Sequence, residues 1–215
     1  MQRETGIIIT RRRPASLLAL TFSAALMLTG GITVYADTSA MEMTQQFVNQ
    51  ALQIMANKQL PVANRTSQLR AVLEPHFDFR EMARQSLGPH WRELTEAQRQ
   101  EFSNVFKNFI ESAYLSKIND YSGQQVQFLR QTSLGAGFVQ VHSTIVQAGK
   151  APIPINYLLD QKDGSWKIYD VTVDNISIIQ NYRNQFNRVI NDSGFDKLLA
   201  DLKAKQQQLA LPQAS

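Results

Sequence analysis

The stretch that decides the fold is WKIYDVTVDNISIIQNYRNQF, residues Trp166–Phe186. Its first half is rich in β-branched and aromatic residues, which favour a strand. Asp174 and Asn175 interrupt this run, and either side chain suits the N-cap of a helix. From Ile176 onward the apolar residues recur at helical spacing. The segment therefore predicts a strand that runs directly into an amphipathic helix, with apolar side chains on both sides of the join.

The rest of the chain divides into a helical half and an alternating half. The N-terminal half carries apolar residues at helical spacing, and its last helix has a wide aromatic stripe and opens on a Thr95–Gln98 capping box. The next part alternates with period two, which predicts strands. Helices followed by strands and again by helices indicate an α+β fold with a four-stranded antiparallel meander. The strands preceding Trp166 are expected around Val126–Phe128, Phe138–Val146 and Ile153–Leu159.

The N-terminus has the three-part layout of a secretory signal peptide. Arg11, Arg12 and Arg13 precede an apolar run over residues 15–28, and Val34-Tyr35-Ala36 supplies small residues at the −3 and −1 positions. An uncleaved anchor is the alternative, but fourteen apolar residues fall short of the roughly twenty that a membrane-spanning helix needs. We expect cleavage after Ala36, a single domain over residues 37–205 and a flexible tail over residues 206–215.

Removing this segment changes the electrostatic interpretation. The whole chain carries a net charge of +4, but the segment takes away four arginines and Glu4, which leaves 18 basic and 17 acidic residues. Nucleic-acid binding needs a concentrated basic face, so the composition argues against a nucleic-acid partner. The chain has no cysteine, so hydrophobic packing alone must hold the domain together.

Catalytic motifs are scarce. None of the three histidines has a partner at metal-ligand spacing, and no nucleophile elbow or phosphate-binding loop is present. His76 and Asp78 suggest a dyad, but Asp78 is better interpreted as the N-cap of the following helix. His142 falls in the middle of a strand. We therefore predict no catalytic and no metal-binding residues, and we expect that the chain is not an enzyme.

Two blocks carry a family resemblance. The first is the Trp166 segment with Tyr169-Asp170 and Ile176-Ser177, and the second is Phe77–Tyr114, with Phe-Asp-Phe, Leu-Gly, Trp91 and Gln98. Together they resemble the MlaC-like periplasmic phospholipid-binding proteins of the Mla lipid-transport pathway, also called toluene-tolerance proteins. The resemblance extends from about Met43 to about Leu202.

The resemblance implies a soluble periplasmic carrier on an NTF2-like, cone-shaped fold whose helices enclose an apolar cavity. Phospholipid is the implied ligand, and no other cofactor is expected. The implied partners are an outer-membrane lipoprotein–porin complex and an inner-membrane ABC transporter complex with a ring of substrate-binding-type domains. The competing hypotheses are a small periplasmic enzyme or an adaptor protein on the same scaffold.

The expected cavity walls are apolar strand faces closed by two helices. We expect Ile176→Glu to abolish lipid retention, because a charge in a dry cavity is costly. We also expect weak head-group selectivity, since no charged cluster in the sequence is typical of a head-group site. The predicted ligand-binding residues are Phe106, Ile110, Tyr114, Val139, Val141, Ile145, Ile155, Tyr157, Leu159, Tyr169, Val171, Val173, Ile176 and Ile179.

Overall fold

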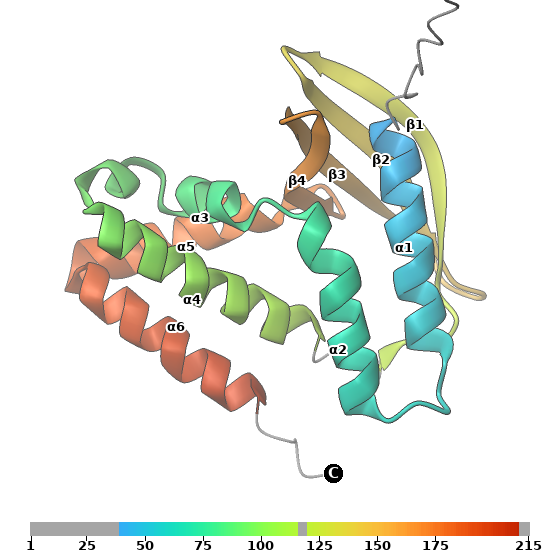
Figure 1. Cartoon of the computed structure of the whole chain (residues 1–215), viewed down its shortest axis with the longest axis horizontal. Helices are drawn as coiled ribbons and strands as arrows, with labels where there is room; N and C mark the ends of the chain where they lie inside the picture. Colours follow the sequence, from blue (N-terminus) through green and yellow to red (C-terminus); the bar gives the residue numbers. More distant parts are fainter. Residues whose placement is uncertain (1–38, 116–119, 211–215) are drawn as a thin grey trace, which may run out of the picture. The chain divides into compact units, whose positions relative to one another are not determined.

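The computed structural model describes residues 39–115 and 120–210 and has an α+β fold, as predicted (Figure 1). The predicted signal peptide lies outside the described residues. The α-helices are α1 (Ala40–Ala56), α2 (Val62–Leu73), α3 (Phe79–Leu87), α4 (Glu96–Leu115), α5 (Ile178–Ser193) and α6 (Phe195–Ala210). Two 3-10 helices, η1 (Glu74–His76) and η2 (Gly88–Glu93), flank α3. The strands are β1 (Gln125–Gly135), β2 (Phe138–Val146), β3 (Ile153–Lys162), β4 (Ser165–Val173) and β5 (Ile176–Ser177).

The sheet is antiparallel, with strand order β1-β2-β3-β4-β5. The four long strands form the predicted meander, and β5 adds a short fifth strand. Helix α1 packs on β1, β2 and α2, whereas α3, α4, α5 and α6 pack against one another. Figure 1 shows the result as two groups, with the sheet and α1 on one side and the four helices on the other.

The junction after β4 differs from the prediction. Asp174 and Asn175 do not cap a helix; they form the two-residue turn of a hairpin in which Val173 pairs with Ile176. Both turn residues have positive φ, 50° and 63°, a conformation that Asp and Asn tolerate and that matches the twist of a hairpin. The helix therefore begins at Ile178, and its N-cap is Ser177.

A buried carboxylate joins the sheet to α5. Asp170 on β4 accepts hydrogen bonds from Ser177 Oγ at 2.5 Å, Val171 N at 2.8 Å and Ile179 N at 3.1 Å. Burial raises the pKa of Asp170, while these three donors act in the opposite direction by stabilising the charged form. The structure places this side chain inside, where it fixes the first turn of α5 against β4.

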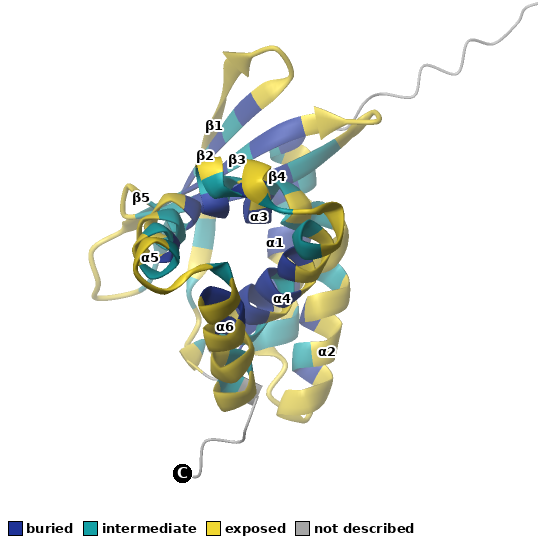
Figure 2. Cartoon of the chain, turned by 90° about the vertical axis from the view of Figure 1, so that its left-hand side faces the viewer, coloured by how far each residue is buried: buried dark blue, intermediate teal, exposed yellow. Residues whose placement is uncertain are grey.

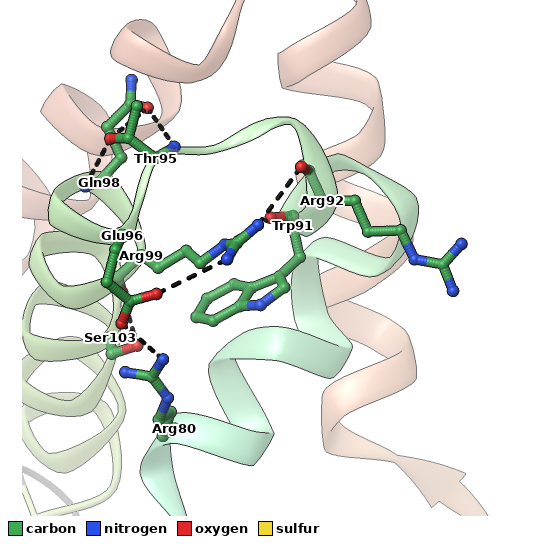
Figure 3. Close-up of polar contacts among 8 residues, drawn as sticks. All are labelled: Arg80, Trp91, Arg92, Thr95, Glu96, Gln98, Arg99 and Ser103. Carbon is green, nitrogen blue, oxygen red and sulfur yellow. Dashed lines mark hydrogen bonds and ion pairs between the residues drawn. The ribbon is translucent and has the colours of Figure 1, made fainter.

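Two other helix starts agree with the sequence. Asp78 caps α3 by accepting from Glu81 N at 2.8 Å. Thr95 N donates to Gln98 Oε1 at 2.9 Å, and Gln98 N donates back to Thr95 Oγ1 at 3.3 Å, which is the predicted capping box (Figure 3).

Trp91 lies between two arginine side chains, in the 3-10 helix η2 that precedes α4. The guanidinium carbons of Arg80 and Arg99 lie 5.9 and 5.7 Å from its ring, and Arg99 Nε donates to the Trp91 carbonyl at 3.0 Å. Glu96 pairs with both arginines, at 2.7 and 3.6 Å (Figure 3). One of the residues behind the family resemblance therefore has a structural role at this position.

Two large hydrophobic cores and one small cluster hold the fold, and the small cluster joins α1, α2 and the end of α4 through Ala51, Leu69 and Leu115. One core joins α3, α4, α5 and α6 and centres on the fully buried Phe102 and Phe106. The other joins α1 to the inner face of the sheet and includes Phe47, Val141 and Leu159. Figure 2 shows the buried segments along α4, α6 and the strands.

Helix α6 reaches Ala210, so residues 206–210 of the segment expected to form a tail are helical. Residues 211–215 lie outside the described part of the chain. Within the described ranges, no helix combines the length and apolar character that crossing a bilayer needs.

We predict that Asp170→Ala lowers the free energy of unfolding by about 3 kcal/mol, because it leaves buried donors of the β4–α5 junction unpaired. Urea titration followed by circular dichroism measures the change. The control is Asp201→Ala, which removes an exposed carboxylate paired with Lys197 on α6 and costs about 0.5 kcal/mol or less. Equal effects of the two substitutions would contradict the role assigned to Asp170.

Candidate functional site

A cavity of about 650 Å³ lies between the sheet, α1, α2 and the C-terminal end of α4. Its volume falls within the roughly 300–1,000 Å³ typical of ligand-binding pockets. The lining residues come from nearly every part of the fold up to Ile178, the first residue of α5. They are Phe47, Val48, Ala51, Leu52 and Met55 of α1, Leu69, Arg70 and Leu73 of α2, Phe77, Phe79 and Met82, Ile110, Glu111, Tyr114 and Leu115 of α4, Asp120, Tyr121 and Gln124, and Val126, Ile145, Gln147, Lys150, Ala151, Ile153, Ile155, Tyr157, Val171, Val173 and Ile178.

The sheet contributes one apolar face because alternate residues of a strand point the same way. Tyr157 on β3 pairs with Val171 on β4, and Ile155 pairs with Val173, so these four side chains share the face toward the cavity. Ile145 continues the wall on β2. The sequence predicted all five of these strand residues as ligand-binding.

A β-bulge changes which residues of β4 face inward. The pairing shifts by one residue between Leu158 and Leu159, and the partner of Leu159 is Ile168. Tyr169 is the extra residue, so Ile168 takes the inward position in its place. The ring of Tyr169 instead packs edge-on against Phe138, at 5.8 Å. Strict alternation from Val171 therefore assigns Tyr169 to the wrong face.

Six further predicted residues do not line the cavity. Phe106 and Ile179 belong to the core of the helical group, and Ile176 is 63% exposed at the β5 turn. The other three face inward but are covered by the core between the sheet and α1. They are Val139, Val141 and Leu159. From α4, only Ile110 and Tyr114 among the predicted residues reach the cavity.

The sequence interpretation missed the contribution of α1 and α2. The apolar stripe of α1, from Phe47 to Met55, forms the wall opposite the sheet. This stripe is visible as a helical pattern in the sequence, but periodicity does not say which element faces it. Phe77 also lines the cavity, because Asp78 N donates to the Ile168 carbonyl at 2.9 Å and holds this segment beside β4.

The wall is mostly uncharged. Burial raises the pKa of both Tyr114 and Tyr157, and the neighbouring Tyr182 adds to the effect at Tyr114. Both phenols therefore stay neutral at physiological pH. Charged side chains occur at four lining positions: Arg70, Glu111, Asp120 and Lys150.

The histidines provide no catalytic arrangement at the cavity. His76 stacks on Phe47 at 5.0 Å between ring centroids, and burial, followed by the charge of Lys167, lowers its pKa. Asp78 serves as a helix cap and does not form a dyad with it. His142 contacts Thr132 at 3.1 Å on the opposite face of the sheet. Among the described residues, no group of three or more His, Asp or Glu side chains is placed to hold a metal ion.

Comparisons with known proteins agree with this architecture. The family model described as MlaC protein matches residues 45–204. The Haemophilus influenzae protein named intermembrane phospholipid transport system binding protein MlaC is 24% identical over 184 residues, which cover 82% of this chain and 86% of that protein.

A solved structure from Ralstonia solanacearum has the same fold. It is described as a phospholipid-binding protein in complex with a phospholipid, and it aligns with a TM-score of 0.71 over 80% of this chain and 99% of its own. At 24% identity this likeness supports the fold alone.

We predict that Ala51→Trp reduces binding of an apolar fluorescent dye at least fivefold, because Ala51 lines the cavity beside Leu69 and Leu115 and the indole would occupy part of the cavity. Because the cavity has room for the indole, we expect the variant to stay folded and to keep the circular-dichroism spectrum of the parent. The matched control is Ala200→Trp on the exposed side of α6, which should bind the dye like the parent. Unchanged dye binding by a folded Ala51→Trp protein would show that the cavity is not the binding site.

Proposed function

We propose that this chain, which belongs to the MlaC protein family, is a phospholipid carrier that holds acyl chains in its apolar cavity. The observation that carries the proposal is the cavity itself, whose walls are mainly aliphatic and aromatic. The names of the Haemophilus relative and of the Ralstonia structure, both of which refer to phospholipid, support the same ligand.

The physical argument concerns the cost of moving lipid through water. Two acyl chains contain on the order of thirty methylene groups, and exposing them costs roughly 24 kcal/mol at about 0.8 kcal/mol each. A carrier that buries the chains offsets most of this cost. Lipid can then pass between a membrane complex and the carrier with a small net change in free energy.

The cellular setting follows from the same proposal. The predicted signal peptide places the mature chain in the periplasm. There it would receive lipid from, or deliver it to, an outer-membrane lipoprotein–porin complex and an inner-membrane ABC transporter complex. The sequence has no ATP-binding motif, so any energy input comes from the transporter.

A hydrolase or other enzyme on this scaffold is the competing function. Such an enzyme needs a nucleophile or a general base inside the cavity. Here Tyr114 and Tyr157 are held neutral, and His76 packs against Phe47. These contacts favour the carrier, and the absence of catalysis remains a prediction.

Native mass spectrometry of the protein, expressed with its own signal segment and purified without detergent, tests the carrier proposal. We expect a bound mass of phospholipid size that is released at high collision energy. Lipid extraction of the same sample should give phospholipid near one molecule per chain. A protein that stays folded and lipid-free after incubation with phospholipid vesicles would refute the proposal.

A pair of glutamate substitutions separates the cavity from its surroundings. Ile155 lines the cavity, so Ile155→Glu should reduce retained phospholipid at least tenfold, because it places a charge in an apolar wall. Ile176 is 63% exposed and does not line the cavity, so Ile176→Glu should retain lipid like the parent. This corrects the expectation from the sequence. Lipid loss in Ile176→Glu alone would contradict the placement of the site.

A further inference from the structure

The mainly apolar cavity wall contains an ion pair between α2 and α4, in addition to the charged lining residues Asp120 and Lys150. Arg70 on α2 and Glu111 on α4 both line the cavity, and Arg70 Nε donates to Glu111 Oε2 at 2.7 Å. The surrounding lining residues of the same two helices are apolar: Leu69 and Leu73 on α2, and Ile110 and Leu115 on α4. The pair is therefore a charged site next to apolar lining residues, and its two members lie 41 positions apart in the sequence.

Only one oxygen of the Glu111 carboxylate has a hydrogen-bond partner. Glu111 is 9% exposed, and its Oε1 atom has no hydrogen-bond partner among the described residues. Natural proteins rarely leave a buried charged oxygen unpaired, because its desolvation is not compensated. Glu111 lines the cavity, and the Cγ–Cδ torsion of a glutamate is soft, so rotation about this bond can reorient Oε1. A ligand in the cavity that carries an N–H donor would satisfy it.

The guanidinium of Arg70 also has hydrogen-bond donors that are not engaged within the described part of the chain. Its side chain is 45% exposed, and within the described part of the chain its one hydrogen-bonded nitrogen is Nε. The two terminal nitrogens present the planar fork that binds a phosphate group through two parallel hydrogen bonds. Glu111 holds the other edge of the guanidinium, so the fork has a fixed orientation.

We propose that Arg70 and Glu111 form a head-group site, and this inference rests on the carrier function proposed above. Arg70 binds the lipid phosphate, and Glu111 Oε1 accepts a hydrogen bond from a primary ammonium. The class of ligand is therefore a phospholipid with an ethanolamine head group. Choline carries a similar charge but has no N–H, so it leaves the carboxylate oxygen unpaired. The carrier is then selective, contrary to the expectation from the sequence.

The test is competitive loading from vesicles. The parent protein is incubated with vesicles that contain phosphatidylethanolamine and phosphatidylcholine in equal amounts and with identical acyl chains. Bound lipid is then extracted and its composition is measured by mass spectrometry. We expect about fivefold or greater enrichment of phosphatidylethanolamine, since hydrogen bonds to charged groups are among the stronger ones. No enrichment would overturn the inference.

A series of lipids with increasingly methylated head groups tests, without any mutation, whether the enrichment depends on an N–H donor. The N-methyl and N,N-dimethyl derivatives of phosphatidylethanolamine keep at least one N–H, whereas phosphatidylcholine has none. Enrichment over phosphatidylcholine should persist through the dimethyl lipid and disappear only with the last N–H. A preference that instead falls steadily with head-group size from the first methyl group would indicate selection by bulk and would contradict the site.

Glu111→Gln should reduce the enrichment to below about twofold, because a neutral amide oxygen accepts a weaker hydrogen bond from an ammonium than a carboxylate does. The matched control is Glu101→Gln, on an exposed position of the same helix and paired with Lys203 at 2.7 Å, which should keep the parental ratio. A parental ratio in Glu111→Gln would overturn the inference. Failure of the parent to bind any lipid would refute the carrier function itself.

Discussion

The cavity depends on the separation of two hydrophobic cores. The aromatic side chains of α4 pack among α3, α5 and α6, where Phe102 and Phe106 are fully buried, so they do not fill the space beneath the sheet. Helix α1 covers the other end of the sheet through a core of its own. Only the last turns of α4, with Ile110 and Tyr114, reach the space between. Each group has a packed core of its own, and the small cluster of Ala51, Leu69 and Leu115 connects them, so the fold accommodates an apolar cavity at a cost in stability.

The two groups are joined by polar contacts at defined positions. Asp170 fixes the start of α5 to β4 through buried hydrogen bonds. The Asp78 amide bonds to the Ile168 carbonyl and brings the segment before α3 beside the same strand. Buried hydrogen bonds are directional, so they set the position of the helices relative to the sheet where apolar packing alone would allow sliding. The width of the cavity therefore follows from contacts outside its lining.

A mainly apolar cavity whose wall includes the Arg70–Glu111 ion pair suits a ligand with a large apolar part and a small charged part. Acyl chains match the aliphatic and aromatic walls, and their burial supplies affinity without regard to the head group. The Arg70–Glu111 pair would orient the head group of the ligand, because each partner has unused hydrogen-bonding capacity. Affinity and selectivity would then come from different parts of one cavity.

The sequence by itself determined the fold class, the four long strands and the helix starts at Asp78 and Thr95, because these depend on local periodicity and capping chemistry. It misplaced Tyr169, since a bulge is a feature of strand pairing, and it misplaced Phe106 and Ile179, since a helical stripe does not reveal which neighbour it faces. Only the tertiary structure decided that α1 forms a wall and that Arg70 meets Glu111, because both depend on contacts between segments far apart in the chain.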